Sequence, residues 1–382
     1  MAIIRSWKET MPKLRITALH NEWPEDGGAE RVHDEVIEQV ADALVVGGHE
    51  VMLLGIYNDL RRLIDGLEEQ KPDLVFNLCE GFGEGDIYEM GVAAVLEMIG
   101  QRFTGTGSMS MALRQDKAVT KKLLAFHDVR APQFATFDTD RLEFAAKMRF
   151  PLLIKPLHGD ASLGVDDGAL VRNYSSLVER INYIHTQLRD TALVEEYIEG
   201  REFYVTILGN DPAEALPLIE LDFSKLPDPY PHIYGREAKF EEGSVQYHST
   251  NAVVATDLPP EVRNRIIMAG VEAAHALQVS DYARVDIRLA PDGRPYVVEV
   301  NANPYLERTG AVAVAALQAG MAYSTLINRI VDTAWRRWEA SEPPKEEDEI
   351  HISKRTKRGR PAERADHEGE EKEADQLLKV AG

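Results

Sequence analysis

Residues 283–304, which read ARVDIRLAPDGRPYVVEVNANP, constrain the fold of this chain more than any other stretch. Two runs rich in β-branched and apolar residues, 283–289 and 295–301, flank turn-forming residues at 290–294. Such runs favour extended backbone, and the proline, aspartate and glycine between them favour a tight reversal of the chain. The stretch therefore predicts a hairpin of two antiparallel strands.

The register of this hairpin decides which of its polar side chains share a face. If the loop holds an even number of residues, Asp286 lies opposite Glu299. Arg284 then lies opposite Asn301, and because side chains alternate along a strand, all four groups point to one face. A three-residue loop with a bulge would instead shift the register and move Glu299 to the other face.

These four side chains have the chemistry of a magnesium site. Asp286, Glu299 and Asn301 offer oxygen ligands, which suit Mg²⁺, a hard cation that binds carboxylates together with substrate phosphates. Arg284 adds hydrogen-bond donors for an anion beside the metal. The alternative is a solvated face with a salt bridge, but two facing carboxylates repel each other unless a cation lies between them. We therefore predict that Asp286, Glu299 and Asn301 bind Mg²⁺.

The order R-x-D and then E-x-N, at 284–286 and 299–301, resembles the ATP-grasp ligases, and among them the D-alanine–D-alanine ligases. In that family the acidic and amide side chains of these strands hold Mg²⁺ against the phosphates of ATP. Several motifs in the same order, across residues 14–338, carry the resemblance. It implies ATP and Mg²⁺ as cofactors, with Mn²⁺ as an alternative metal.

The resemblance implies a fold of mixed α/β and α+β class, in which an N-terminal parallel α/β (pre-ATP-grasp) domain precedes a two-subdomain ATP-grasp fold. The N-terminal sequence agrees, because apolar runs alternate with helical patterns. The predicted strands are 14–19, 50–56, 73–78 and a short one within 102–107, and the predicted helices are 32–44 and 87–99. The predicted domains are an N-terminal α/β substrate domain at 1–108, a central ATP-grasp subdomain at 109–194, a C-terminal ATP-grasp subdomain with the Mg²⁺ site at 195–340, and a charged disordered tail at 341–382.

Two lysines are candidates for phosphate binding. Asp116 can cap a helix that opens with Lys117, and in the family such an aspartate–lysine pair opens the ATP-grasp region, which implies that Lys117 reaches phosphate. Lys155 lies within an apolar strand, where a buried ammonium group needs an anionic partner. The loop that follows, 158–165, resembles the family's phosphate-covering loop, and Ser162 and the backbone amides would contact phosphate there.

The resemblance implies further nucleotide contacts in two later segments, 193–209 and 234–240. In the family, the end of a strand reads adenine, a later glutamate holds the ribose, and another lysine binds phosphate. The matching residues are Glu195, Glu196 and Ile198 for adenine, Glu202 for ribose and Lys239 for phosphate. A helix at 260–279 is predicted to pack behind the metal hairpin.

Glu30 is the candidate substrate-binding residue of the N-terminal part. It lies in the run GGAER at 27–31, at a strand-to-helix junction, where open α/β sheets bind ligands. In the family the matching glutamate approaches the amino group of the first amino acid. The alternative interpretation is a glutamate at the start of a helix, favoured by the helix dipole.

The implied reaction is an ATP-dependent carboxylate–amine ligation. The γ-phosphoryl group of ATP moves to a substrate carboxylate, and an amine displaces phosphate from the acyl phosphate, which gives an amide, ADP and phosphate. Such a transfer depends on positioning and on charge stabilisation. Arg284 is the predicted catalytic residue at the transferred group and the oxyanion, and Glu30 acts at the substrate.

The substrate side departs from the family pattern. LeuCysGluGly at 78–81 stands where the family has a His-Gly pair, Ala161-Ser162 replaces two serines, and Phe240 replaces a tyrosine. These changes concern substrate contacts more than ATP contacts. The ATP-binding part therefore resembles the family more closely than the amino-acid pocket does.

The segment after the metal ligands, 303–310, also differs. Tyr305 stands where the family has a glycine, and Gly310 stands where it has a serine that holds the carboxylate of the second substrate. Arg308 is a candidate replacement for that serine because of its charge and position.

Three functions remain open from the sequence. The leading one is a D-alanine–D-alanine ligase-like enzyme of peptidoglycan synthesis, with amino acids as small-molecule substrates and a homodimer expected from the family. The second is an ATP-grasp ligase for other amino acids or small peptides in a biosynthetic pathway. The third is a non-catalytic ATP-binding regulator that contacts DNA or a partner through its tail, where ArgGlyArgPro at 358–361 resembles an AT-hook core. A solvated tail is the default interpretation.

Composition limits the partners and the location. A net charge of −21 argues against a general affinity for nucleic acid or anionic lipid. The single cysteine, Cys79, cannot form an internal disulfide, which fits a reducing cytosol, and we expect it to be a buried thiol. We see no apolar run with the length of a signal peptide core or a membrane span. We therefore expect a cytoplasmic protein with no membrane partner.

Overall fold

The computed structural model of the chain describes residues 11–24, 31–83, 85, 88–138, 148–159 and 162–341. The described residues up to Trp338 belong to one compact unit. Glu30, Ala161 and the tail from 342 onward, with its AT-hook-like run, lie outside the described residues, so the predictions made for them stay predictions.

The N-terminal sheet is built around β1 (Arg15–Asn21), which pairs in parallel with β4 (Glu50–Ile56) on one side and with β5 (Leu74–Asn77) on the other. Parallel neighbours need a crossover connection, and α1 (Val36–Val46) and α2 (Leu60–Gln70) supply the two crossovers. The predicted parallel sheet is therefore confirmed. The sequence analysis did not predict α2.

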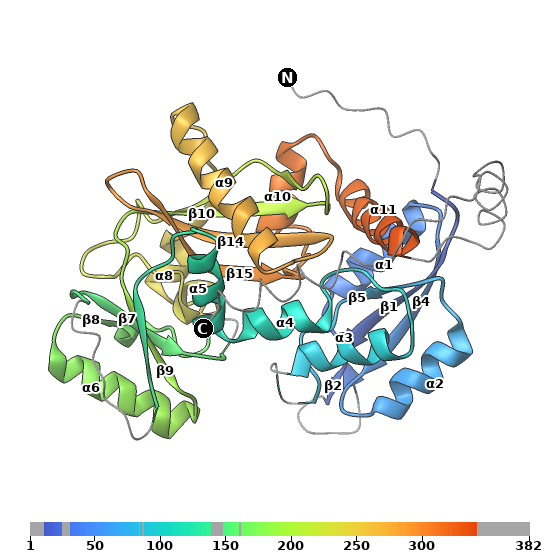
Figure 1. Cartoon of the computed structure of the whole chain (residues 1–382), viewed down its shortest axis with the longest axis horizontal. Helices are drawn as coiled ribbons and strands as arrows, with labels where there is room; N and C mark the ends of the chain where they lie inside the picture. Colours follow the sequence, from blue (N-terminus) through green and yellow to red (C-terminus); the bar gives the residue numbers. More distant parts are fainter. Residues whose placement is uncertain are drawn as a thin grey trace, which may run out of the picture. The chain divides into compact units, whose positions relative to one another are not determined.

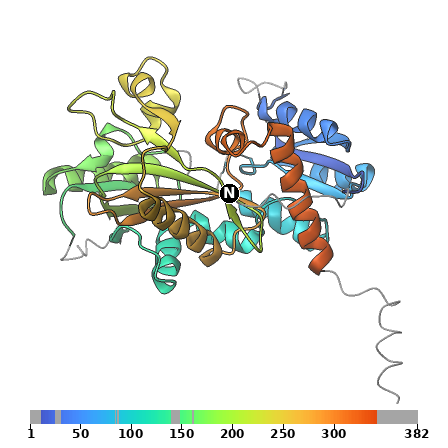
Figure 2. The ribbon, with the colours of Figure 1, turned by 90° about the horizontal axis from the view of Figure 1, so that it is seen from above.

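Helices cover both faces of the N-terminal sheet (Figure 1). On one face, α1 and α11 (Tyr323–Ser341) pack together, and Ile16 and Ile330 belong to one apolar core. On the other face, α2 and α3 (Glu89–Met98) pack around Leu63. Figure 2 also shows α11 running alongside this sheet, so the last described helix returns to the first part of the chain.

Residues 102–107 do not form the predicted strand. Among the described residues they make a single isolated parallel bridge, between Val75 and Phe103. The chain turns at Gly105, which has a φ of +88° and donates its N–H to Asp281 Oδ2 at 2.8 Å. The prediction is wrong because this left-handed backbone ends the extended run.

A buried salt bridge anchors α11 at this turn. Arg337 donates from Nε and Nη2 to the two carboxylate oxygens of Asp281, at 2.9 and 2.8 Å. Asp281 is 0% exposed. The carbonyl of Phe103 accepts from Arg337 Nη2 at 2.9 Å and from Trp338 Nε1 at 2.8 Å. These contacts join the end of α11 to the residue that precedes β14.

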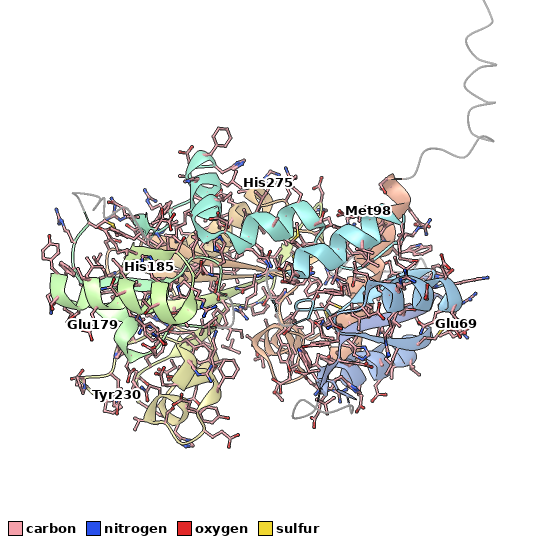
Figure 3. All side chains as sticks on the ribbon, turned by 90° about the horizontal axis from the view of Figure 1, so that it is seen from below. Glu69, Met98, Glu179, His185, Tyr230 and His275 are labelled. Atoms are coloured by element: carbon pink, nitrogen blue, oxygen red, sulfur yellow. The ribbon has the colours of Figure 1, made fainter. Side chains whose placement is uncertain are left out.

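The middle sheet is antiparallel throughout and has the order β6 (Phe134–Phe137), β9 (Ala192–Glu196), β7 (Leu152–Pro156), β8 (Leu170–Val171). The buried face of α6 (Tyr174–Tyr183) contributes to the core of this sheet. One turn farther on, the Nε2 atom of His185 lies 2.8 Å from the carbonyl oxygen of Phe137. Figure 3 labels Glu179 and His185 on this helical stretch.

The C-terminal sheet carries the predicted hairpin. Its order is β13 (Asn251–Val254), β12 (Ile219–Asp222), β10 (Arg201–Leu208), β14 (Tyr282–Leu289), β15 (Pro295–Ala302). As predicted, a helix packs behind the hairpin, and α9 (Pro260–Ala276) contacts β10, β14 and β15. Helix α9 approaches β10 closely at Gly270, where a Cβ atom would lie 2.8 Å from Val205 Cγ1.

The remaining elements are short. They are β2 (Trp23–Pro24), β3 (Arg31–Val32), β11 (Glu214–Ala215), α4 (Ser108–Gln115), α5 (Lys117–Phe126), α7 (Arg236–Phe240), α8 (Val245–Ser249), α10 (Ala311–Gln318), a 3₁₀ turn at Asp167–Ala169 and a π turn at Ile184–Leu188. Within the described ranges, no single helix has the length and apolar character to cross a membrane. The pair α10 and α11 meets those two criteria together, with a bend of 100° between them.

We expect Asp281→Ala to lower the free energy of unfolding by about 3 kcal/mol, because it leaves the guanidinium of Arg337 without its carboxylate partner. Chemical denaturation measures the change. Asp257→Ala is the control, since Asp257 pairs with Arg201 on the surface and is 70% exposed. Equal unfolding midpoints for the two variants would contradict the anchoring role of Asp281.

Candidate functional site

The hairpin has the predicted facing pairs. Asp286 lies opposite Glu299, and Arg284 lies opposite Asn301. The loop is odd, because Ala290 and Arg294 close it with an N–H to carbonyl bond of 3.0 Å around three residues. The hairpin therefore has the odd loop with a bulge that was the alternative, but Glu299 has not moved to the other face as that alternative implied.

A β-bulge reconciles the odd loop with the facing pairs. The register shifts between Asp286 and Ile287, which lie opposite Glu299 and Val297, so Val298 is the extra residue of β15. One extra residue reverses the alternation of side chains, and it returns Glu299 to the face of Asp286.

Arg284 neutralises the acidic pair on this face. Its Nε and Nη2 atoms donate to Asp286 Oδ1 and Oδ2 at 2.7 and 3.0 Å. Burial raises the pKa of Asp286 to about 6, an effect that Arg284 opposes and Glu299 reinforces. Arg284, on the same strand as Asp286, thus supplies a positive charge to the acidic pair, as in the salt-bridge alternative.

One cavity, which we call the main cavity, lies between residues of the middle and C-terminal sheets. It brings together all eight residues predicted to bind the nucleotide: Lys117, Lys155, Ser162, Glu195, Glu196, Ile198, Glu202 and Lys239. Asp286 and Glu299 line the same cavity, whereas Arg284 and Asn301 are the next facing pair along the hairpin.

Lys155 has the anionic partner that its burial requires. Its Nζ atom lies 3.3 Å from one oxygen of Glu195, and Lys121 Nζ lies 2.8 Å from the other. Glu195 is 1% exposed. Burial by itself raises the pKa of Glu195, but the two ammonium groups outweigh burial and lower it. The carboxylate assigned to adenine is thus held between two lysines.

Sequence reasoning missed Lys121, although a signal was present. Lys121 follows Lys117 by four residues on α5, so the two lie on one face of the helix. Asp116 caps this helix, as predicted, by accepting from the N–H groups of Ala118 and Val119 at 2.9 Å each. Lys121 is 3% exposed, and its ion pair with Glu195 acts against the cost of that burial.

Arg288 is a second missed residue, and it organises the segment between β9 and β10. Its Nε donates to the carbonyl of Ile198 at 2.9 Å, and its Nη1 donates to Glu202 Oε2 at 2.9 Å. Its Nη2 donates to the hydroxyl of Tyr197 at 3.0 Å and to the carbonyl of Gly200 at 3.1 Å. The pattern Arg-x-Asp-x-Arg at 284–288 is the signal, because alternation puts all three side chains on one face.

Of the other predicted phosphate ligands, Lys117 contacts the loop that precedes β8, and Ser162 belongs to that loop. Lys117 Nζ donates to the carbonyl oxygen of Gly159 and, at 3.4 Å, to that of Leu157. Ser162 has a φ of 62° and donates from Oγ to the carbonyl of Tyr234 at 3.3 Å. Burial lowers the pKa of Lys239, and Glu299 acts against that shift.

Comparison with known proteins decides the family. The model of a family described as D-ala D-ala ligase C-terminus matches residues 123–332, which is more than half of the chain. The chain belongs to the D-alanine–D-alanine ligase family. It is therefore an enzyme of the ATP-grasp ligase class, as predicted.

Two curated relatives and one solved structure illustrate the match. The chain is 34% identical, over 83% of its own length and 90% of the relative's, to an uncharacterized protein of Sinorhizobium fredii. It is 30% identical, over 77% of its length and 90% of the relative's, to the D-alanine–D-alanine ligase of Sphingopyxis alaskensis. The D-alanine–D-alanine ligase of Bacillus anthracis, solved in complex with ATP, matches with a TM-score of 0.65 and 23% identity, over 86% of this chain and 100% of that one. This likeness confirms the predicted fold class.

Three of the residues that depart from the D-alanine–D-alanine ligase pattern, Cys79, Tyr305 and Arg308, do not line the main cavity. Cys79 is 2% exposed, as expected for a buried thiol, and burial raises its pKa. Tyr305 donates its hydroxyl to Asp34 Oδ2 at 2.6 Å. Arg308 places its guanidinium 4.9 Å from the ring centre of Tyr323, so its proposed role as a substitute for the missing serine gains no support from this position.

We expect Lys121→Met to lower the free energy of unfolding by about 3 kcal/mol, because it leaves Glu195 with one cation in a buried site. The displaced carboxylate should also weaken ATP binding, which calorimetry measures. Lys122→Met is the matched control, since Lys122 is the exposed neighbour on the same helix. If the two variants unfold and bind ATP alike, the buried pair has no such role.

We expect Arg288→Lys to raise the KM for ATP about tenfold or more, with a smaller effect on kcat. Lysine has no planar guanidinium and cannot form at once the hydrogen bonds by which Arg288 holds the Ile198 carbonyl and the Glu202 carboxylate. Steady-state kinetics with varied ATP measures the change. Arg294→Lys, at the exposed hairpin turn, is the control, and an unchanged KM in Arg288→Lys would contradict the expectation.

Proposed function

We propose that this chain joins an amino acid to a second amine by ATP-dependent ligation through an acyl phosphate. The observation that carries the proposal is the hairpin face, which sets Arg284 and Asn301 beside the pair Asp286 and Glu299 at the wall of a cavity lined with lysines. Oxygen ligands next to several cations are the groups that phosphoryl transfer requires.

Each of the eight predicted nucleotide-binding residues of the main cavity has a role in this proposal. Lys117, Lys155 and Lys239 hold the phosphates, and the loop with Ser162 covers them. Glu196 and Ile198 face the adenine, and Glu202 faces the ribose. Glu195 keeps Lys155 in place through their ion pair of 3.3 Å. A carboxylate group fixed in this way does not need to reorganise when the nucleotide binds.

The residues of the hairpin fit Mg²⁺ by their chemistry. The described residues hold no group of three or more histidine, cysteine, aspartate or glutamate side chains suited to a metal. Asp286, Glu299 and Asn301 would therefore share the cation with phosphate oxygens, which is the coordination that Mg²⁺ prefers. When bound, the metal neutralises charge on the transferred phosphoryl group.

Arg284 connects metal binding to the reaction. In this structure both of its hydrogen bonds go to Asp286. With a cation held by Asp286, the Arg284 guanidinium would lose part of its hold on that carboxylate, and its donors would be available to the substrate carboxylate and the phosphoryl group. The donors then stabilise charge on the oxyanion as the amine attacks and phosphate leaves.

The relatives named D-alanine–D-alanine ligase support D-alanine as the first substrate to test, together with a role in peptidoglycan synthesis and a cytoplasmic location. The ligase for other amino acids is the second candidate, because Tyr305 and its bond to Asp34 alter the substrate side. We also propose the domain boundaries predicted above. The sheets support them to within two residues, since strands of the N-terminal, middle and C-terminal sheets lie at 15–77, 134–196 and 201–302, and β9 runs two residues past the boundary at 194.

We expect Glu299→Gln to lower kcat/KM for ligation at least a hundredfold, because the amide removes one charge from the metal site. The measurement is ADP formation with ATP, Mg²⁺ and a panel of D- and L-amino acids. A chelator should abolish ADP formation, and added Mg²⁺ should restore it. Glu272→Gln, at an exposed position of α9, is the control.

Two outcomes would count against the proposal. Full turnover by Glu299→Gln would remove Glu299 from the metal site. Binding of ATP with no ADP formation from any amino acid would instead favour the non-catalytic regulator.

A further inference from the structure

The polar face of the metal hairpin continues onto the next strand of the C-terminal sheet. β10 pairs with β14 so that Tyr204 lies opposite Asp286. Residues directly opposite each other point to the same side of a sheet, so Tyr204 shares the face of Asp286 and Arg284. Its neighbours Phe203 and Val205 point to the other side and belong to the core that α9 covers. Tyr204 is therefore a side chain of the candidate site that comes from outside the hairpin.

The ring of Tyr204 lies against the guanidinium group of Arg284. The Cζ atom of Arg284 is 4.4 Å from the centre of this ring. The two residues are diagonal neighbours on adjacent strands, and an aromatic and a long side chain can meet across such a diagonal. The negative face of a ring attracts a cation at this distance, and the attraction is stronger where water is excluded. Tyr204 is 5% exposed, so the contact is shielded from water.

Apolar packing holds the Tyr204 ring in place. Tyr204 belongs to the same buried apolar cluster as Leu221, Phe223 and Leu306. It also lines the main cavity, together with Asp286. The position of the ring therefore depends on the core of the protein and not on the charges of the site.

The hydrogen bonds of Arg284 depend on a group that has a second task. Both of them go to Asp286, which is also a predicted ligand of the cation. In the proposed function, Arg284 loses part of this hold when its donors are needed at the transferred phosphoryl group. An arginine side chain without fixed partners has many conformations, and ordering it costs conformational entropy. The Tyr204 ring is no metal ligand, so its contact with the guanidinium persists when a cation binds.

Two other cations of the main cavity have the same kind of partner. Lys239 Nζ lies 5.4 Å from the centre of the Tyr234 ring, and Arg288 Cζ lies 4.9 Å from the centre of the Tyr197 ring. Both rings line the main cavity. An aromatic ring positions a cation without adding a negative charge that would repel phosphate. The contact beside the metal hairpin follows this pattern.

We propose that Tyr204 is a positioning residue for the ligation, whose ring holds the Arg284 guanidinium at the transferred phosphoryl group while Asp286 binds the cation. This inference rests on the proposed ligase function. Because the ring acts through Arg284, it affects turnover more than ATP binding. Phenylalanine presents the same ring face and preserves the role, whereas leucine fills part of the space without a ring.

The test compares Tyr204→Leu with Tyr204→Phe in the full-length enzyme, by ADP formation with ATP, Mg²⁺ and the panel of amino acids. We expect Tyr204→Leu to lower kcat at least about tenfold, the effect of losing a shielded cation–π contact, and to change the KM for ATP less than about threefold. Tyr204→Phe should restore most of the lost kcat. The matched control is Tyr183→Leu, because the Tyr183 ring lies 4.5 Å from the Arg180 guanidinium and does not line the main cavity.

A double-mutant cycle separates positioning from packing. In the Arg284→Met background, Tyr204→Leu should cause no further loss of kcat, because the ring has no guanidinium to hold. Equal losses in the two backgrounds would overturn the inference while ligase activity stands. So would a Tyr204→Phe variant as slow as Tyr204→Leu, since the hydroxyl and not the ring would then matter.

The same cycle is also measured by urea unfolding of the protein without ligands, which needs no turnover. Tyr204→Leu should lower the unfolding midpoint more in the native background than in the Arg284→Met background. If no amino acid is turned over, the proposed function fails, and this second cycle decides the contact alone. A larger shift in the native background would sustain the hold of the ring on Arg284, and equal shifts would overturn it.

Discussion

One β-bulge determines whether the candidate site exists. The hairpin loop is odd, so regular strands would turn Glu299 away from Asp286, and a cation could not reach both carboxylates. The extra residue, Val298, restores the alternation and places Glu299 opposite Asp286. Because α9 packs behind both strands, the face opposite to α9 is free to carry polar groups. Because of this single inserted residue, Glu299 lies on the same face as Asp286 and Arg284, at the wall of the main cavity that the lysines line.

Each buried charge around the main cavity is stabilised by oppositely charged or hydrogen-bonding partners, and none is buried alone among the residues described next. Glu195 lies between Lys121 and Lys155, and Arg288 is surrounded by carbonyl, hydroxyl and carboxylate acceptors. Burial alone disfavours each ion, and the partner charges offset that cost. The result is a cavity whose electrostatic field is fixed before a ligand arrives. Nucleotide binding then exchanges partners among charges that are already in place, which suits a reaction governed by positioning.

The hairpin face also separates two kinds of residue. Residues that follow the D-alanine–D-alanine ligase pattern, such as Lys155 and Glu299, line the main cavity. Cys79 and Tyr305, which depart from that pattern, line a separate cavity beside Tyr282. Arg284 lies between the two groups. A change of substrate can therefore arise at one end of the face without disturbing nucleotide binding at the other.

The sequence by itself determined the features that depend on local pattern. Alternation identified the polar face of the hairpin, apolar periodicity identified the parallel N-terminal sheet and α9, and the order of motifs identified the family. The tertiary structure decided features that depend on partners distant in the chain. The ion pairs of Lys121 with Glu195 and of Arg337 with Asp281 are two such features. The bulge at Val298 is a third. A periodic pattern reports which face of an element is buried, but the free energy of a buried charge depends on which distant group packs against it, and only the folded chain settles that.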